Sequence, residues 1–225
     1  MADAFVSEKL RLRFSKKGRA VYISHLDLMR TMQRAFLRAG CTLKYSEGFN
    51  PHPLLSILLP LGVGCASDCE LMDFQLAAAE DLSTLPERLS AVMPEGIRAL
   101  EVTPAARKAK ELKWLRVSGT LEYDHADVAA VRDGLQAFFA QKTIVIEKKT
   151  KRGMGESDIA PAIREIGFTA GEKCVRLAAV ISAQEPTLNP EHLVSALRQL
   201  APELAPDFAE FTRLEVYDEK MRVFR

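Results

Sequence analysis

The order of strand-like and helix-like segments repeats along the chain, and this repeat most constrains the fold. With a short hairpin arm in the first half set aside, each half gives strand, helix, strand, strand, helix and strand. This is the order of the ferredoxin-like split β-α-β unit, whose antiparallel sheet carries helices on one face and leaves the other open. We therefore predict an α+β protein with two tandem ferredoxin-like (βαββαβ) units, over residues 1–103 and 113–225. Residues 104–112, "PAARKAKEL", are predicted to be a linker.

The first half begins with strict alternation in "EKLRLRF", where Leu10, Leu12 and Phe14 point one way and basic residues point the other. After the turn "SKKGR" and a short hairpin arm, "AVYIS", Ser24 is expected to cap a helix over residues 25–39, which Gly40 ends. The remaining segments are predicted strands "CTLKYS", "LLSILLP", "CELMDFQLA" and "IRALEVT", and a helix around residues 82–92.

The second half repeats the pattern without detectable residue-level similarity to the first. Its predicted strands are "KWLRVSGTLEY", "TIVIEKK", "KCVRLAAVIS" and "EFTRLEVYD", and its predicted helices cover residues 124–140 and the segment "NPEHLVSALRQL". The duplication is therefore inferred from element order alone.

Positive charge is concentrated near the beginning of the chain. The net charge of the whole chain is +1, but residues 1–60 carry ten Lys or Arg against four Asp or Glu, a net +6 that leaves −5 for the remainder. Such asymmetry favours an anionic partner at one end of the molecule. The candidate phosphate-binding residues of this region are Arg11, Arg13, Lys16, Lys17, Arg30, Arg34 and Arg38.

Arg30, Arg34 and Arg38 stand four residues apart and are expected to line one exposed stripe of the first helix. Guanidinium groups one turn apart suit successive phosphates, although a solvated helix face is the simpler interpretation. A second basic, Gly-containing stretch, "EKKTKRGMGESD", adds Lys149, Lys151 and Arg152 as candidates. It lacks the final Lys-Ser/Thr of a Walker loop, and a mobile charged hairpin tip is the alternative.

The loop "YSEGFNPHP" (residues 45–53) combines turn formers with many groups able to bind or react. Gly48 permits a positive φ, and two prolines stiffen the exit. We expect its polar groups to face the start of the first helix, with Asn50 and His52 binding phosphate and Glu47 paired with His25, Arg30 or a loop amide. Alternatively, Glu47, His52 and His25 are acid–base catalysts, or the loop is purely structural.

Composition excludes several other classes. Nearly half of the 225 residues are hydrophobic, yet no apolar run approaches a membrane span and the start does not resemble a signal peptide, so we expect a cytoplasmic protein. Four scattered cysteines do not form a disulfide framework. Cys65 and Cys69 lack the spacing of a zinc site, and no motif for an iron–sulfur cluster occurs, so we predict no metal and no cofactor.

Three stretches resemble the uncharacterised radical-SAM-associated domain family: "FSKKGRAVYISHLDLMRTMQRAFLRAG", "YSEGFNPHPLLSILLPLGVG" and "ELMDFQL". "KKTKRGMGESDIAPAI" is similar to a weaker stretch of the family. Members stand alone or are linked to cobalamin-binding radical S-adenosylmethionine proteins. The resemblance implies a possible radical SAM partner but no activity, and Leu54 departs from the polar or basic residue expected at its position. The following residues match the family motif: Ser24, His25, Asp27, Arg30, Ser46, Glu47, Gly48, Asn50, Pro51, His52, Pro53 and Ser56. A more distant resemblance to tandem ferredoxin-like CRISPR RNA-processing proteins concerns the fold alone.

These observations favour an accessory RNA-binding protein for tRNA or rRNA processing or modification, which recognises the phosphate backbone through its basic face. The alternatives are an enzyme acting on RNA or a phosphorylated substrate, and a protein-docking module for a radical SAM enzyme. The sequence leaves the oligomeric state open.

Overall fold

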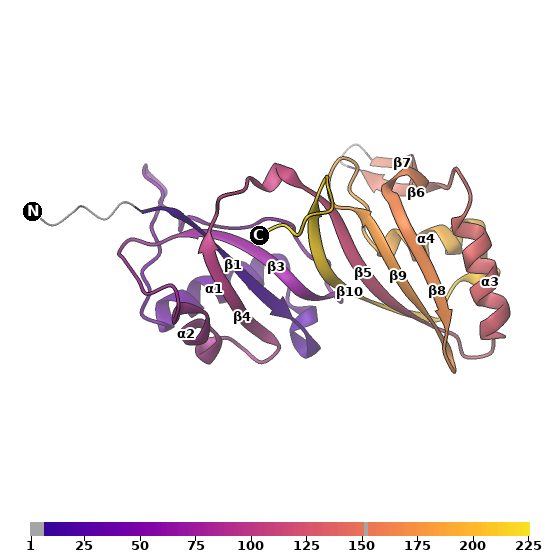
Figure 1. Ribbon diagram of the computed structural model, residues 1–225, viewed down its shortest axis with the longest axis horizontal. Coiled ribbons are helices and arrows are strands. Elements are labelled where there is room, and N and C mark those ends of the chain that lie inside the picture. Colours follow the sequence, from indigo (N-terminus) through magenta and orange to yellow (C-terminus); the bar gives the residue numbers. More distant parts are fainter. Residues whose placement is uncertain (1–6, 151–152) are drawn as a thin grey trace, which may run out of the picture. The chain divides into compact units, whose positions relative to one another are not determined.

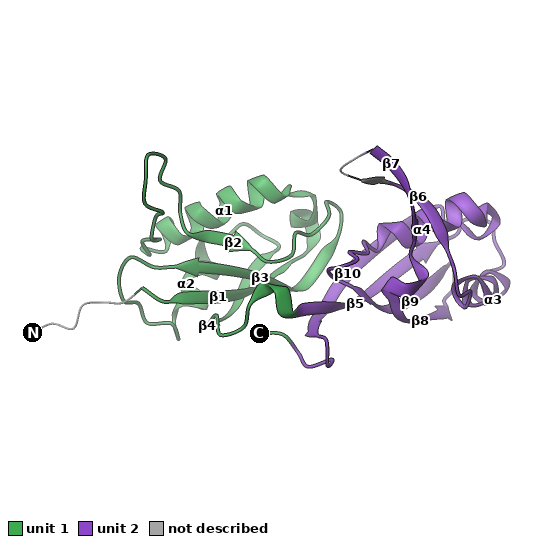
Figure 2. Cartoon of the chain, turned by 90° about the horizontal axis from the view of Figure 1, so that it is seen from above, with its two compact units in different colours: residues 1–111, 224–225 green, residues 112–223 purple. Residues whose placement is uncertain are grey.

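The computed structural model describes residues 7–150 and 153–225, and it divides the chain into two compact units. Figure 2 colours residues 1–111 and 224–225 as unit 1 and residues 112–223 as unit 2. The fold is mixed α+β: the described residues form four α-helices, and their paired strands within each unit are antiparallel. The division falls within the predicted linker, between Glu111 and Leu112, but the final two residues belong to the first unit.

Unit 1 contains a sheet with the strand order β4-β1-β3-β2 (Figure 1). Its elements are β1 (Lys9–Lys16), the 3-10 helix η1 (Gly18–Tyr22), α1 (His25–Arg38), β2 (Leu55–Ile57), β3 (Ala66–Gln75), α2 (Leu85–Val92), β4 (Ile97–Pro104) and the 3-10 helix η2 (Ala109–Glu111). One apolar core includes side chains from β1, β3, β4 and both helices. The alternation of Leu10, Leu12 and Phe14 places all three in this core, as predicted.

The start and end of α1 follow the local rules. The Ser24 hydroxyl accepts a hydrogen bond from the Asp27 amide, and Gly40 follows the helix with a φ of +75° that an L-residue rarely adopts. Two predictions for the flanking segments are wrong. "AVYIS" enters a 3-10 helix, and "CTLKYS" forms only isolated bridges at Leu43 and Tyr45. Each of these two residues pairs with another segment at a single position, and two isolated bridges do not make a continuous strand.

Unit 2 contains a sheet with the strand order β10-β5-β9-β8 and a separate two-stranded sheet of β6 and β7 (Figure 1). Its elements are β5 (Leu112–Glu122), α3 (Val128–Phe139), β6 (Val145–Thr150), β7 (Gly153–Asp158), the 3-10 helix η3 (Ala160–Ala162), β8 (Ile163–Ala170), β9 (Cys174–Ser182), α4 (Glu191–Leu200), the 3-10 helix η4 (Pro202–Leu204) and β10 (Phe208–Asp218).

The segment "TIVIEKK" was expected to be a strand of the main sheet of unit 2, and this is wrong. It forms β6, which pairs with β7, whereas β8 pairs with β9 in the main sheet. The side chain of Gln199 on α4 holds the β6–β7 hairpin, because its amide accepts from the Glu147 N–H at 2.8 Å and donates to the Glu147 carbonyl at 3.1 Å.

Candidate nucleic-acid interface

Arg11 was expected on an open basic face of the first sheet, and this expectation is wrong. Its side chain is 2% exposed and lies opposite Asp73 on β3. Nε and Nη2 donate to the two Asp73 carboxylate oxygens at 2.7 and 3.1 Å, and Nη2 also donates to the Arg107 carbonyl at 2.8 Å. The Phe224 ring lies 4.9 Å from the Arg11 guanidinium and 4.7 Å from that of Arg107. The end of the chain therefore covers the side of the sheet on which Arg11 lies.

Lys16 was also expected to be a surface cation, and it is buried instead. Its ammonium donates to the carbonyls of Val21 and Ile23, each at 3.0 Å, and so fixes the connection between β1 and α1. Burial lowers the pKa of Lys16, while the nearby Glu70 and Cys65 act in the opposite direction. This lysine is a structural donor and cannot contact an external phosphate.

Two further cations of this region have acidic neighbours. Arg13 is half-buried, with Nε 3.5 Å from Glu101, and Lys17 forms an ion pair with Asp68. Both pairs are partly exposed to solvent, where an ion pair contributes little to stability and can exchange partners. The cations of β1 and its turn therefore do not form the continuous free surface that the sequence indicated.

The helix arginine row (Arg30, Arg34 and Arg38) is exposed, as predicted from its spacing. Arg30 lies 3.0 Å from Asp27, whose carboxylate also accepts from the Ser24 hydroxyl at 2.8 Å. These hydrogen bonds, that of Ser24 first, lower the pKa of Asp27. Arg34 and Arg38 have no carboxylate partner among the described residues, and Arg38 makes only a long contact of 3.5 Å with the Val92 carbonyl. Their charges are the ones available to a ligand.

Arg34 and Arg38 line a cleft between α1 and the end of α2, with a volume of about 280 Å³. The other lining residues are Thr31, Val92, Met93 and Pro94. No acidic side chain lines this cleft, which we call the arginine cleft. Two guanidinium groups one helical turn apart can each donate two hydrogen bonds to a phosphate or carboxylate.

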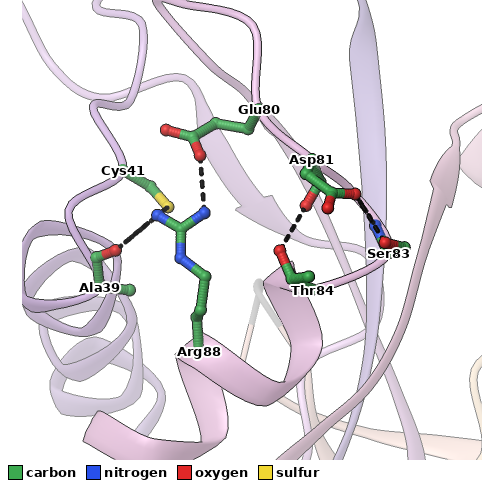
Figure 3. A network of polar contacts seen from close by, with 7 residues as sticks. All are labelled: Ala39, Cys41, Glu80, Asp81, Ser83, Thr84 and Arg88. Atoms are coloured by element: carbon green, nitrogen blue, oxygen red, sulfur yellow. Dashed lines mark hydrogen bonds and ion pairs between the residues drawn. The ribbon is translucent and has the colours of Figure 1, made fainter.

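Arg88 on α2 contacts the residue that follows α1 and so joins the two helices that flank the cleft (Figure 3). Its Nη2 donates to the Ala39 carbonyl at 2.7 Å and lies 3.2 Å from the Cys41 sulfur, while Nη1 lies 2.7 Å from Glu80. Burial, followed by Glu80, raises the pKa of the Cys41 thiol, and Arg88 opposes this shift. This contact is not predictable from the sequence, because nothing in the spacing of Arg88 indicates which carbonyl it reaches.

Beside Arg88, the same view shows how the approach to α2 is held. The Asp81 carboxylate accepts from the Ser83 amide at 2.9 Å and from the Ser83 hydroxyl at 2.6 Å, and the Thr84 hydroxyl donates to the Asp81 carbonyl at 3.1 Å. These contacts lower the pKa of Asp81. The turn that enters α2 is thereby ordered by its own side chains.

The loop "YSEGFNPHP" forms the end of a narrow hairpin over residues 44–54. The Leu54 amide donates to the Lys44 carbonyl at 2.7 Å, and Tyr45 and Pro53 form an isolated bridge. Ser46 and His52 are joined by a 2.9 Å backbone hydrogen bond and by a 2.9 Å contact between the Ser46 hydroxyl and His52 Nδ1. Hydrogen bonds therefore join the two arms of the hairpin below its tip.

The expectation that this hairpin faces the start of α1 is wrong. Leu55, just after the hairpin, pairs with Phe74, which also pairs with Leu10 near the start of β1. The helix begins only after β1 has ended, and a strand of eight residues spans about 26 Å. The hairpin therefore lies at the end of unit 1 where α1 finishes.

The candidate acid–base residues are consequently not brought together. Among the described residues, no hydrogen bond or ion pair joins the hairpin to Ser24, His25 or Asp27, and Glu47 has no such partner at all, contrary to the expected pairing. His52 contacts Ser46 and, at 3.5 Å, the Asn50 carbonyl. Glu47, Asn50 and His52 are exposed.

Other candidate sites lie outside what the structure describes or are not metal sites. Lys151 and Arg152 fall outside the described residues, and so does the side chain of Lys149. Cys65 and Cys69 are buried. Within residues 7–150 and 153–225, no group of three or more His, Cys, Asp or Glu side chains could hold a metal ion. Nor does any described helix have the length and apolarity needed to cross a membrane.

These features define a two-unit α+β protein with an arginine-lined cleft on its first unit. The chain belongs to DUF2344, a family of uncharacterised proteins conserved in bacteria, whose profile matches residues 9–190. A comparison with curated proteins finds no match.

Similar solved structures share little sequence with the chain. A crystal structure of a Cbf5-Nop10-Gar1 complex matches 93% of this chain at 11% identity, with a TM-score of 0.50. The match covers 50% of the other chain, so this protein spans about half its length. An unknown protein from Galdieria sulphuraria also matches, at 10% identity and a TM-score of 0.26, over 95% of this chain and 99% of that one. The CRISPR endoribonuclease Cse3 bound to a 19 nt RNA matches at 14% identity and a TM-score of 0.19, over 91% of this chain and 99% of the other. At 11% identity, the likeness to the Cbf5-Nop10-Gar1 structure concerns the fold alone.

Proposed function

We propose that this protein is an accessory RNA-binding protein of the cytoplasm that contacts the phosphate backbone through the arginine cleft. The proposal rests on the exposure and the surroundings of Arg34 and Arg38. Both are exposed, both line the cleft, and neither has a carboxylate partner in the described part of the chain. Unpaired guanidinium groups at a concave surface are the usual means of holding phosphates.

The spacing of the row suits a polyanion better than a single ion. Arg34 and Arg38 are one turn apart, about 5.4 Å along the helix axis, and Arg30 continues the row toward the helix start. Arg30 forms an exposed ion pair with Asp27. Solvent weakens such a pair, and a phosphate can take the place of the Asp27 carboxylate. Phosphate contacts of this kind position a nucleic acid without reading its sequence.

The proposal includes the architecture that we predicted. Each main sheet is antiparallel with its strands in the order fourth, first, third, second within its unit, and each unit has two helices between strands in the ferredoxin-like order. We therefore propose that the chain is a tandem of two ferredoxin-like units. A role in processing or modifying tRNA or rRNA, and an association with a radical SAM enzyme, are further parts of the proposal.

No observation favours the enzymatic alternative for Glu47, His52 and His25. A general acid and base must lie within hydrogen-bond reach of one reacting group. Here His25 begins a helix at the end of unit 1 that is remote from the hairpin, and His52 contacts Ser46.

The test is to replace Arg34 and Arg38 with Ala and to measure RNA binding between about 50 and 200 mM salt. We use a short single-stranded RNA, because each phosphate contact with a single strand contributes about 0.7 to the slope of log K against log salt. The double variant should bind more weakly, with a slope reduced by about 1.4. Replacing two other exposed arginines, Arg98 and Arg176, with Ala removes the same charge elsewhere and should leave more of the affinity. Equal losses in both double variants would contradict the proposal.

A further inference from the structure

Phe49 stands at the tip of the hairpin with its side chain entirely in solvent. Its relative exposure of 111% is the largest among the exposed large hydrophobic residues. A Phe side chain that makes no apolar contact contributes nothing to the core, and burying it would stabilise the protein by about 1.5–3 kcal/mol. Leaving it exposed is explained if another molecule covers the ring.

Hydrogen bonds join the two arms of the hairpin below this ring. Below the tip, Ser46 and His52 are joined by backbone and side-chain hydrogen bonds, and the His52 amide also donates to the Ser46 hydroxyl at 3.1 Å. Gly48, immediately before Phe49, has a φ of +112° that strongly favours glycine and turns the chain at the tip. Because the arms are ordered in the free protein, little entropy is lost when a ligand meets the ring.

The residues next to Phe49 in the sequence carry groups that suit the edge of a nucleobase. Glu47 stands two residues before Phe49 and Asn50 one residue after it; both are exposed, and Glu47 has no hydrogen-bond or ion-pair partner among the described residues. A carboxylate accepts from exocyclic amino groups, and an amide can both donate and accept. The same carboxylate repels phosphate, so the tip is suited to a base and unsuited to the backbone.

The hairpin is within reach of the arginine cleft. Tyr45 follows Arg38 by seven residues, which limits the separation of their Cα atoms to about 25 Å. The hairpin and Arg38 both lie at the end of unit 1 where α1 finishes. One RNA strand can therefore contact Arg38 through its phosphates and Phe49 through a base.

We propose that the 44–54 hairpin binds an unpaired RNA base, which stacks on the Phe49 ring while Glu47 and Asn50 contact its edge. This rests on the proposed function and adds a ligand class to it, namely single-stranded rather than fully paired RNA. Aromatic side chains bind splayed-out bases in this way, and duplex bases are already stacked on one another.

The experiment compares Phe49→Leu with Phe49→Trp. Leu keeps an apolar side chain but has no ring, and Trp keeps an aromatic face. The probes are a short labelled oligoadenylate and an RNA duplex of equal length, and the control is Phe208→Leu, at a Phe that is 51% exposed. Loss of one stacked base should weaken oligoadenylate binding about 5- to 150-fold in Phe49→Leu. Phe49→Trp should bind oligoadenylate at least as tightly as the wild type. Phe208→Leu should bind it as tightly as the wild type.

Duplex binding should be the same in all four proteins, since it uses phosphates alone. Unchanged oligoadenylate affinity in Phe49→Leu would overturn the hairpin proposal, as would an equal loss on the duplex. The proposed function fails separately: it falls if the wild type binds neither RNA, or if the Arg34 and Arg38 double variant binds both as well as the wild type. Because the Phe49 side chain is fully exposed, its replacement should leave the fold intact.

Discussion

At the scale of single residues, the basic side chains near the start of the chain have different roles despite their shared charge. Arg11 and Lys16 are buried donors to the protein itself, and Arg13 and Lys17 have acidic neighbours. Among the candidate phosphate-binding residues of this region, the exposed arginines of α1 remain suitable for an external anion. Burial and partnership therefore decide which cations can bind a ligand, and net charge alone does not.

The buried pair of Arg11 and Asp73 gives a prediction about stability. Replacing Arg11 with Met leaves a buried carboxylate with only the partly exposed Lys9, at 3.5 Å, beside it. The free energy of unfolding should fall by about 3 kcal/mol or more, as for other broken buried pairs. Urea unfolding measures this loss. Replacing Asp73 with Leu in the same chain should restore most of it, and a single Arg11→Met variant as stable as the wild type would show that the pair is unimportant.

At the scale of elements, the turn that leads into β4 packs tightly against the turn that follows β1. The Lys17 amide donates to the Gly96 carbonyl at 2.7 Å, and Gly96 has a φ of +87°. A Cβ atom at Gly96 would lie 2.3 Å from the Lys17 carbonyl oxygen, whereas one at Gly64, with a φ of +90°, would meet nothing within 4 Å. The two glycines thus share a backbone conformation but differ in their surroundings.

This difference predicts unequal effects of Gly96→Ala and Gly64→Ala. Both variants incur the cost of a left-handed residue, about 1–2 kcal/mol. Gly96→Ala should lose clearly more, because backbone must also move to relieve the clash. Thermal unfolding of the two variants side by side measures the comparison. Equal melting temperatures would contradict the prediction, because they would show that the turn after β1 and the turn before β4 can move apart without loss of stability.

Much of the first unit could be predicted from local pattern, and the rest depends on distant residues. Alternation identifies the core side of β1, and Ser24 and Gly40 mark the ends of α1. Alternation cannot show what covers the opposite side, because Phe224 packs there from the far end of the sequence.

The candidate site was predictable to a similar extent. The four-residue spacing correctly predicted the exposed arginine row, whereas the wall that α2 adds to it depends on the contact between Arg88 and Ala39. The positive φ at the tip of the hairpin was predictable from Gly48. Its position was not, because strand pairing places it near the end of α1 and away from the start.

At the scale of the whole molecule, the account assigns the anion-binding surface to unit 1. The net charge of +6 in residues 1–60 suggested this location, and the arginine cleft and hairpin give it a structural form. Unit 2 contributes a second antiparallel sheet and the β6–β7 hairpin, which Gln199 attaches to α4. Membership in an uncharacterised bacterial family makes a direct test of ligand contact the most useful next step.

The central claim, that the arginine cleft contacts RNA, is tested most directly by ultraviolet crosslinking of the wild-type protein to a short single-stranded RNA, followed by mass spectrometry of the crosslinked peptides. The account predicts crosslinks within residues 31–38 and 92–94, together with residues 45–53 at the hairpin. These crosslinks should decrease as salt rises, since they depend on phosphate contacts. Crosslinks confined to residues 112–223, or none in the α1 segment, would contradict the account.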